Sequence, residues 1–180
     1  MELSAKHVRA VLRAGLLGVL LALLGCGEKE ELAPRGQTFA ELREIRAGVS
    51  VELPGDAARS PYPRERLVDG SVVQLEPSAL VWLRRDSGAR LLIAGPAKFS
   101  LRADAVKFET GRVFVDAPPG VAVALDTPSG RLTPSDVRAS IEIGKTTRAY
   151  VLRGELALKD VRVRAGEELS LAGDKASVAA

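Results

Sequence analysis

Histidine and cysteine are nearly absent from this sequence. Of 180 residues, one is a histidine (His7) and one is a cysteine (Cys26). A single cysteine excludes an intrachain disulfide. Because no histidine follows residue 7, most of the chain lacks the usual general base of hydrolase triads and the commonest zinc ligand. We therefore expect no enzyme: the sequence predicts no catalytic residue, no metal site and no cofactor.

Aromatic residues and net charge are also scarce. Phe, Trp and Tyr make up 4% of the chain, so its core must be built from smaller apolar side chains, which suits thin, strand-rich layers. The formal net charge of +3 falls to +1 beyond residue 25, because Lys6, Arg9, Arg13 and Glu2 lie before it. Nucleic-acid binding requires a concentrated basic surface. We therefore expect no nucleic-acid partner.

The first hydrophobic segment is too short for a permanent membrane helix. The uncharged run from Ala14 to Gly27 has 14 residues, whereas a spanning helix needs about 20. It follows basic residues and ends at Cys26, as a signal peptide does. The letters LLGC that end there resemble a bacterial lipoprotein signal, which implies lipidation of Cys26. The alternative is a signal peptide without lipidation, and the position of the only cysteine favours the lipoprotein.

This segment sets the expected division of the chain. Residues 1–25 are predicted to be the lipoprotein signal peptide, and residues 26–36 a charged, flexible tether. Residues 37–173 form one folded domain, and residues 174–180 form a tail. In bacterial lipoproteins an Asp directly after the lipidated cysteine resembles an inner-membrane retention signal, but in this chain Gly27 follows Cys26. We therefore expect a periplasmic domain that is lipid-anchored at the outer membrane.

Short apolar alternations separated by Gly and Pro fill residues 37–173. The stretch DGSVVQLEPSALVWLRRDSGARLLIAGPAKFSL, residues 69–101, sets this rule, which is typical of strands with one buried face. Trp82 is expected in the core; the alternative is a sugar-stacking platform, which would need to face outward beside polar partners. Turns are predicted at Gly95-Pro96 and Thr110-Gly111, and Gly154 is expected to start a strand. These signals predict an all-β fold of short, mostly antiparallel strands, either a small β-solenoid or a two-sheet sandwich.

The order of several sequence phrases resembles a known family. LREIRAGVSVELPG, LVDGSVVQLEPSALVWL, AGPAKFSL, FETGRVFVDAP, LDTPSGR, YVLRGELALKD and VRVRAGEELSL follow one another between Glu41 and Gly173. Together they resemble the periplasmic FecR-type domain of bacterial envelope regulators, and the match is worst at Thr133–Val137. Family members carry a cytoplasmic region and a membrane helix before this domain. Here we expect the sensor domain alone, on a lipid anchor.

Three residues are predicted partner contacts. Tyr62 lies between prolines in a long loop, where an aromatic side chain is expected to be exposed. Arg84 and Arg85 end a predicted strand and form a modest basic stripe with Arg90 and Arg102. The resemblance implies a non-catalytic protein-interaction module in envelope sensing or signalling, whose partner is an envelope protein such as a transporter or membrane regulator. The alternative is a module that binds carbohydrate or another envelope polymer.

Overall fold

The computed structural model describes residues 38–46, 48–158, 161–173 and 175–180. Within these ranges the chain forms thirteen β-strands and no helix, which confirms the expected all-β fold. The predicted signal peptide and tether, including Cys26, lie outside the described residues. The strands are β1 (Thr38–Arg43), β2 (Val49–Glu52), β3 (Arg66–Val68), β4 (Val72–Leu75), β5 (Leu80–Arg85), β6 (Arg90–Leu101), β7 (Ala105–Ala122), β8 (Ala124–Thr127), β9 (Gly130–Ile143), β10 (Thr147–Leu158), β11 (Val161–Arg164), β12 (Glu168–Ala172) and β13 (Lys175–Ala179).

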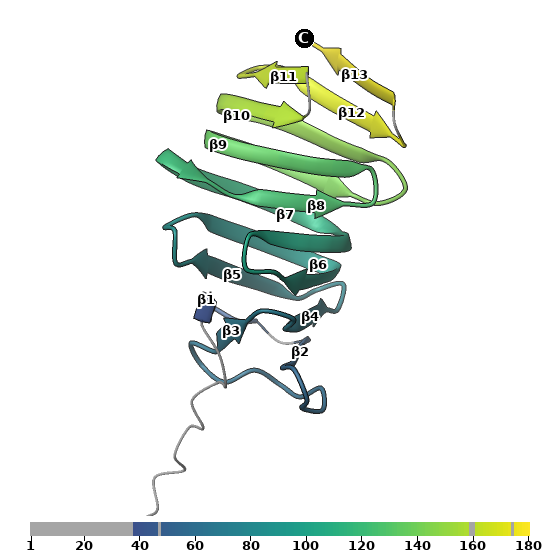
Figure 1. Ribbon diagram of the computed structural model, residues 1–180. Coiled ribbons are helices and arrows are strands. Elements are labelled where there is room, and N and C mark those ends of the chain that lie inside the picture. Colours follow the sequence, from purple (N-terminus) through teal and green to yellow (C-terminus); the bar gives the residue numbers. More distant parts are fainter. Residues whose placement is uncertain (1–37, 47, 159–160, 174) are drawn as a thin grey trace, which may run out of the picture. The chain divides into compact units, whose positions relative to one another are not determined.

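All of these strands belong to one sheet (Figure 1). The hydrogen-bonded order is β13-β12-β10-β9-β8-β7-β6-β5-β1-β3. Strand β11 pairs with β10, while β2 pairs with β4, which in turn pairs with β6. The β7–β8 pairing is parallel, and the other strand pairings of the described residues are antiparallel. Strands that follow one another in the sequence are therefore mostly neighbours in space.

Four long strands change partners part-way along their length. Residues 90–94 of β6 pair with β5, and residues 97–100 pair with β4. Residues 147–150 of β10 pair with β12, and residues 155–158 pair with β11. Strands β7 and β9 behave in the same way. The sheet therefore has two ladders that share β6, β7, β9 and β10.

We name the two ladders by their strands. Ladder 1 consists of β1, β5, β12 and β13 together with residues 90–94, 111–117, 137–143 and 147–151 of the shared strands. Ladder 2 consists of β2, β4, β8 and β11 together with residues 97–101, 105–110, 130–135 and 155–158.

Glycines lie inside the strands where the partners change, so the predicted turns there are wrong. Gly111 lies within β7, and a Cβ at this position would be 2.7 Å from the Cβ of Ala97 in β6. Gly154 lies within β10 with a φ of 79°, and a Cβ there would overlap the carbonyl oxygen of Asp136 in β9. The predicted turn at Gly95-Pro96 likewise falls inside β6. These glycines allow close backbone approach rather than ending strands.

Alternate side chains of both ladders meet in one hydrophobic core. In β5 the buried side chains are those of Val81, Leu83 and Arg85, so Leu80 and Trp82 lie on the outer face. The prediction that Trp82 is a core residue is therefore wrong, because the strand has the opposite phase. The largest fully buried side chains are Phe99, Phe108, Leu42, Leu67, Leu83, Leu91, Ile93, Leu101, Leu125, Leu132, Ile141 and Leu156.

The structure confirms the predicted long loop and the predicted hairpin but not the predicted tail. Residues 54–64 lie outside the named strands, as the prolines predict, although Arg59 forms an isolated bridge with Val51. The predicted hairpin around Gly144-Lys145 is present, since β9 and β10 pair there. Residues 175–179, assigned from the sequence to a tail, instead form β13, which pairs with β12.

Candidate functional site

Tyr62 is exposed, and a buried carboxylate holds its loop in place. The Tyr62 side chain is 52% exposed, whereas Glu65 is only 6% exposed. Both terminal nitrogens of Arg59 donate to the Glu65 carboxylate, at 2.9 and 3.1 Å. The Tyr62 backbone N–H donates to the same carboxylate at 2.9 Å. The Arg59 guanidinium carbon lies 4.4 Å from the centre of the Tyr62 ring, a favourable cation–π distance. The loop therefore presents a pre-organised aromatic side chain.

The same contacts account for the electrostatics of the loop. The hydrogen bond with Glu65 raises the pKa of Arg59 above its usual value. A bidentate pair between a guanidinium and a carboxylate fixes both groups geometrically as well as by charge. Arg59 therefore stays charged and remains stacked on the ring of Tyr62.

An open depression adjoins this loop. It has a volume of about 550 Å³ and is lined by Arg43, Glu44, Ile45, Pro61, Pro63 and Arg64. Glu44 and Arg64 both have left-handed backbone conformations, with φ of 48° and 60°. Such conformations cost about 1–3 kcal/mol each and cluster at functional sites. The rim next to Tyr62 is therefore a candidate contact surface.

Arg84 and Arg85, the two neighbouring arginines of β5, have different environments. Arg84 lies on the outer face of ladder 1, opposite Arg90 of β6 and Glu41 of β1. Arg85 is 8% exposed and donates to the carbonyl oxygens of Arg102 at 3.1 Å, Ala103 at 2.9 Å and Ala105 at 3.4 Å. Burial lowers the pKa of the Arg85 guanidinium below its usual value. Arg85 therefore stabilises the β6–β7 turn, and its predicted role as a contact does not fit this position.

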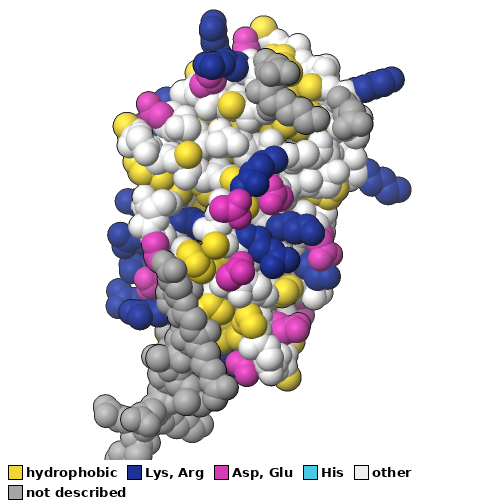
Figure 2. Space-filling view, viewed as in Figure 1, with side chains coloured by type: hydrophobic (Ala, Val, Ile, Leu, Met, Phe, Trp, Pro, Cys, Tyr) yellow, Lys and Arg dark blue, Asp and Glu magenta, His cyan; other side chains and the backbone are white. Residues whose placement is uncertain are grey.

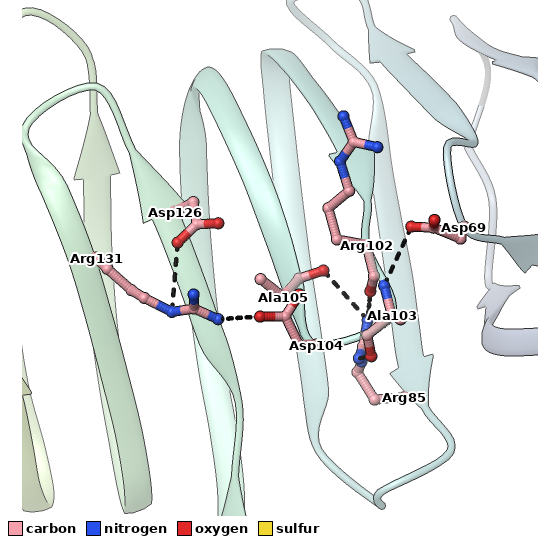
Figure 3. A network of polar contacts seen from close by, with 8 residues as sticks. All are labelled: Asp69, Arg85, Arg102, Ala103, Asp104, Ala105, Asp126 and Arg131. Carbon is pink, nitrogen blue, oxygen red and sulfur yellow. Dashed lines mark hydrogen bonds and ion pairs between the residues drawn. The ribbon is translucent and has the colours of Figure 1, made fainter.

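Charged side chains fix the same turn from both sides (Figure 3). Asp69 accepts a hydrogen bond from the Ala103 backbone N–H at 3.2 Å. Arg131 lies between Asp104, at 2.6 Å, and Asp126, at 3.5 Å. The hydrogen bond from Arg131 holds the pKa of Asp104 below its usual range. This network has the properties of structural support for the turn.

A second depression, of about 310 Å³, is lined by Glu41, Arg84, Arg85 and Asp86. Its charges are balanced, since two arginines face two carboxylates. The Arg85 guanidinium is already engaged by carbonyl oxygens. Arg84 is therefore the lining residue whose position on the outer face suits contact with another molecule.

Strand β13 lies at one end of the sheet. Its five residues pair with β12 in continuous register, from Lys175 opposite Ala172 to Ala179 opposite Glu168. Among the described residues, no strand pairs with its other side. All five β13 side chains are exposed, including that of Val178 at 42%. Such an edge has backbone donors and acceptors that can pair with another strand.

The outer face of ladder 1 carries an apolar row that the sequence pattern did not reveal. Trp82 lies opposite Leu92, Leu92 opposite Phe114, Phe114 opposite Ser140, and Ser140 opposite Tyr150. We call these five residues the outer row. Tyr150 is 45% exposed, and Trp82, Leu92 and Phe114 are half-buried. The row joins residues that are far apart in the sequence, so only the strand order brings them together.

Charged side chains surround the apolar ones on this protein. Figure 2 shows Lys and Arg side chains interspersed with Asp and Glu over the face in view. Ion pairs join Arg138 to Asp116 on ladder 1 and Lys98 to Glu109 on ladder 2, both at 3.0 Å. On the face in view, Lys and Arg are therefore not gathered into one concentrated basic patch.

Metal-binding clusters and membrane-spanning helices are both missing from the described part of the chain. It contains no group of three or more His, Cys, Asp or Glu side chains arranged to hold a metal ion. Over the same residues, no helix has the length and hydrophobicity that crossing a membrane requires. Cys26, the predicted lipidation site, lies outside them.

Comparison with known proteins adds no identity to this geometry. No family model and no curated protein matches the chain significantly. Assignment of function therefore depends on the sequence signals and on the surfaces described above.

Proposed function

We propose that this chain is a periplasmic lipoprotein, anchored at the outer membrane through lipid on Cys26, with a FecR-like β domain. In this proposal the domain is a non-catalytic protein-interaction module for envelope sensing or signalling. Its partner is another envelope protein, such as a transporter or a membrane regulator. The sequence phrases that resemble the FecR-type domain, and the apolar segment that ends at the only cysteine, support this assignment.

The open edge of β13 is the observation that carries the proposal. Peptides commonly bind by adding a strand to an exposed sheet edge, where main-chain hydrogen bonds provide affinity. The edge presents Lys175–Ala179, in which Lys175 at one end carries the one charge and the other four residues are Ala, Ser or Val. Another strand can therefore approach residues 176–179 without meeting a charged side chain. A partner with an extended segment would continue the antiparallel order of β12 and β13.

The Tyr62 loop supplies a second contact of the right kind. Exposed aromatic side chains are enriched among the residues that dominate protein interfaces. Because Arg59 and Glu65 already fix the loop, little conformational entropy is lost when Tyr62 binds. The adjoining depression provides a concave surface into which a partner side chain fits.

A photocrosslinking residue at Val178 tests the edge directly in intact cells. We expect discrete adducts with an envelope protein from Val178, and no such adduct from Thr133, an exposed position on ladder 2. Adjacent residues of a strand direct their N–H groups to opposite edges. Of the variants Ala176→Pro and Ser177→Pro, one therefore removes an N–H donor from the open edge, and the other removes a donor to β12. Only the first should abolish the adduct while β13 stays paired with β12.

Two results would contradict partner binding at the β13 edge. Equal adducts from Val178 and Thr133, or adducts that both proline variants leave intact, would contradict recognition by strand addition. Retention on purified cell-wall polymer, with no protein adduct from Val178 or Tyr62, would instead favour a polymer-binding module.

The anchor has its own test. Cys26→Ser should move the protein from the membrane fraction to the soluble periplasmic fraction and abolish incorporation of a labelled fatty acid. Unchanged membrane association and labelling in this variant would refute the lipoprotein assignment.

A further inference from the structure

The outer row has the spacing of a repeating ligand. Neighbouring strands in a sheet are about 4.8 Å apart. Trp82 and Phe114 are separated by two strand steps, and so are Phe114 and Tyr150. Their backbone positions therefore recur about every 10 Å across ladder 1, twice the strand spacing. Leu92 and Ser140 occupy the intervening strands.

We propose that the outer row binds an extended β-1,4-linked glycan strand. In such a strand successive sugars are turned by about half a rotation, so every second sugar presents the same face. The length of this disaccharide repeat is comparable to the separation of Trp82, Phe114 and Tyr150. Each ring then has the apolar face of one sugar to stack upon, as flat aromatic surfaces do with flat partners.

Polar side chains on both sides of the row suit the hydroxyl groups of a sugar. They occupy most of the register positions two residues away in the same strands. Arg112, Glu142 and Arg148 lie on one side, where Leu80 and Ala94 take the positions next to Trp82 and Leu92. Arg84, Arg90, Asp116 and Arg138 lie on the other side. Arginine supplies several donors and carboxylates supply acceptors, so this border can pair with hydroxyls of either role. A ligand site of this kind combines apolar surface with a few polar groups that fix orientation.

The width and charge of the row argue against other polymers. A stable protein interface buries about 800 Å² per partner around an apolar centre, whereas the apolar surface here is a narrow row. It is widened only by Leu80 and Ala94 at one end and by the exposed Leu152 at the other. Carboxylates and arginines are mixed along both borders, with Asp116 opposite Arg138 and Glu142 opposite Arg148. Neutral hydroxyls can pair with both kinds of group, whereas phosphate is attracted only by the arginines.

The outer face of ladder 2 differs from that of ladder 1 in its side chains. It carries Gln74, Lys98, Lys107, Asp126, Arg131 and Thr133 in place of aromatic side chains. Ion pairs occur on both faces, as in Lys98–Glu109 on ladder 2 and Arg138–Asp116 on ladder 1, both at 3.0 Å, so the aromatic side chains are what distinguishes the two. The aromatic periodicity is therefore a property of one face and not of the fold as a whole.

Trp82 makes the proposal directly measurable, because it is the only tryptophan in the chain. Titration of the full chain with cellohexaose, a β-1,4-linked hexasaccharide, should change Trp82 fluorescence in a saturable way. Maltohexaose, which has the same sugars in α-1,4 linkage, should not, because its curved chain cannot follow a straight row. Cellobiose should bind much more weakly, since it covers only one aromatic position.

Substitutions in the row separate stacking from folding. Tyr150→Ala should weaken cellohexaose binding by about tenfold, equivalent to about 1.4 kcal/mol. Tyr150→Phe keeps the ring and should retain binding, while Tyr62→Ala, outside the row, should leave it unchanged. Urea unfolding of each variant checks that the fold is intact. Phe114→Ala is the second test, because Phe114 lies in the middle of the row.

Several results would overturn the proposal. These are no saturable response to cellohexaose, an equal response to maltohexaose, or unchanged affinity in both Tyr150→Ala and Phe114→Ala. Capture of a protein by a photocrosslinker at Tyr150, without any glycan response, would assign the outer row to a protein partner instead. The proposal concerns a different surface from β13, so either surface can fail its test while the other passes.

Discussion

Gly154→Ala should destabilise the domain far more than an equivalent change at Gly120. Both glycines have left-handed backbone conformations, with φ of 79° and 75°. A Cβ at Gly154 would overlap the Asp136 carbonyl oxygen, whereas nothing lies within 4 Å of a Cβ at Gly120. The unfavourable φ costs about 1 kcal/mol at either site. Displacement of β9 by the clash adds about 2 kcal/mol at Gly154 alone.

Urea denaturation followed by Trp82 fluorescence measures this difference. With a slope of about 2 kcal/mol per molar urea, Gly120→Ala should lower the midpoint by about 0.5 M and Gly154→Ala by about 1.5 M. The lower unfolded-state entropy of alanine is common to both variants and cancels in the comparison. Equal midpoints for the two variants would refute the claim that β9 and β10 approach closely at Gly154.

Three further changes test the charged contacts. Arg85→Met should lower the free energy of unfolding by about 2 kcal/mol because buried carbonyl oxygens lose their donors. The control Arg84→Met should change it by less than about 0.5 kcal/mol. Similar urea midpoints for the two variants would contradict a structural role for Arg85. Glu65→Gln should increase cleavage of the Tyr62 loop by trypsin, and an unchanged rate in limited proteolysis would show that the carboxylate does not hold the loop. The pKa of Asp104 is lowered, so its ion pair with Arg131 stabilises the fold above the usual carboxyl pKa, and this contribution is lost as pH falls through the lowered pKa. In Asp104→Asn the urea midpoint should therefore depend less on pH in the acid range. Identical profiles of urea midpoint against pH for the two proteins would count against the pair.

The fold class could be predicted from the sequence because period-two alternation and frequent Gly and Pro leave little alternative to strands. The phase of an individual strand could not. In β5 the residues Leu80, Val81, Trp82 and Leu83 are all apolar, so either alternate set suits a core, and a shift of one residue exchanges the two faces. Packing against β1 and β6 decides the phase and places Trp82 outside.

Strand length was also hidden in the sequence, for a different physical reason. Gly111 and Gly154 carry the conformational freedom of turn residues. In the structure that freedom serves close approach to a neighbouring strand within a continuous β7 or β10.

Some candidate contact residues could be predicted from local sequence, and others depend on contacts between distant segments. Exposure of Tyr62 follows from the prolines beside it and was predicted correctly. The burial of Arg85 depends on the β6–β7 turn, about 17 to 20 residues further along the chain. The outer row depends on the order of β5, β6, β7, β9 and β10, which local sequence does not encode.

The long strands have a consequence for how the domain comes apart. Because β6, β7, β9 and β10 each run through both ladders, the two sides of the core are joined by continuous backbone and not by flexible connections. Opening of one ladder therefore disturbs strands that the other ladder also uses, so the four shared strands are expected to open together. Strand β13, which among the described residues pairs with β12 alone, is instead the part that can separate first.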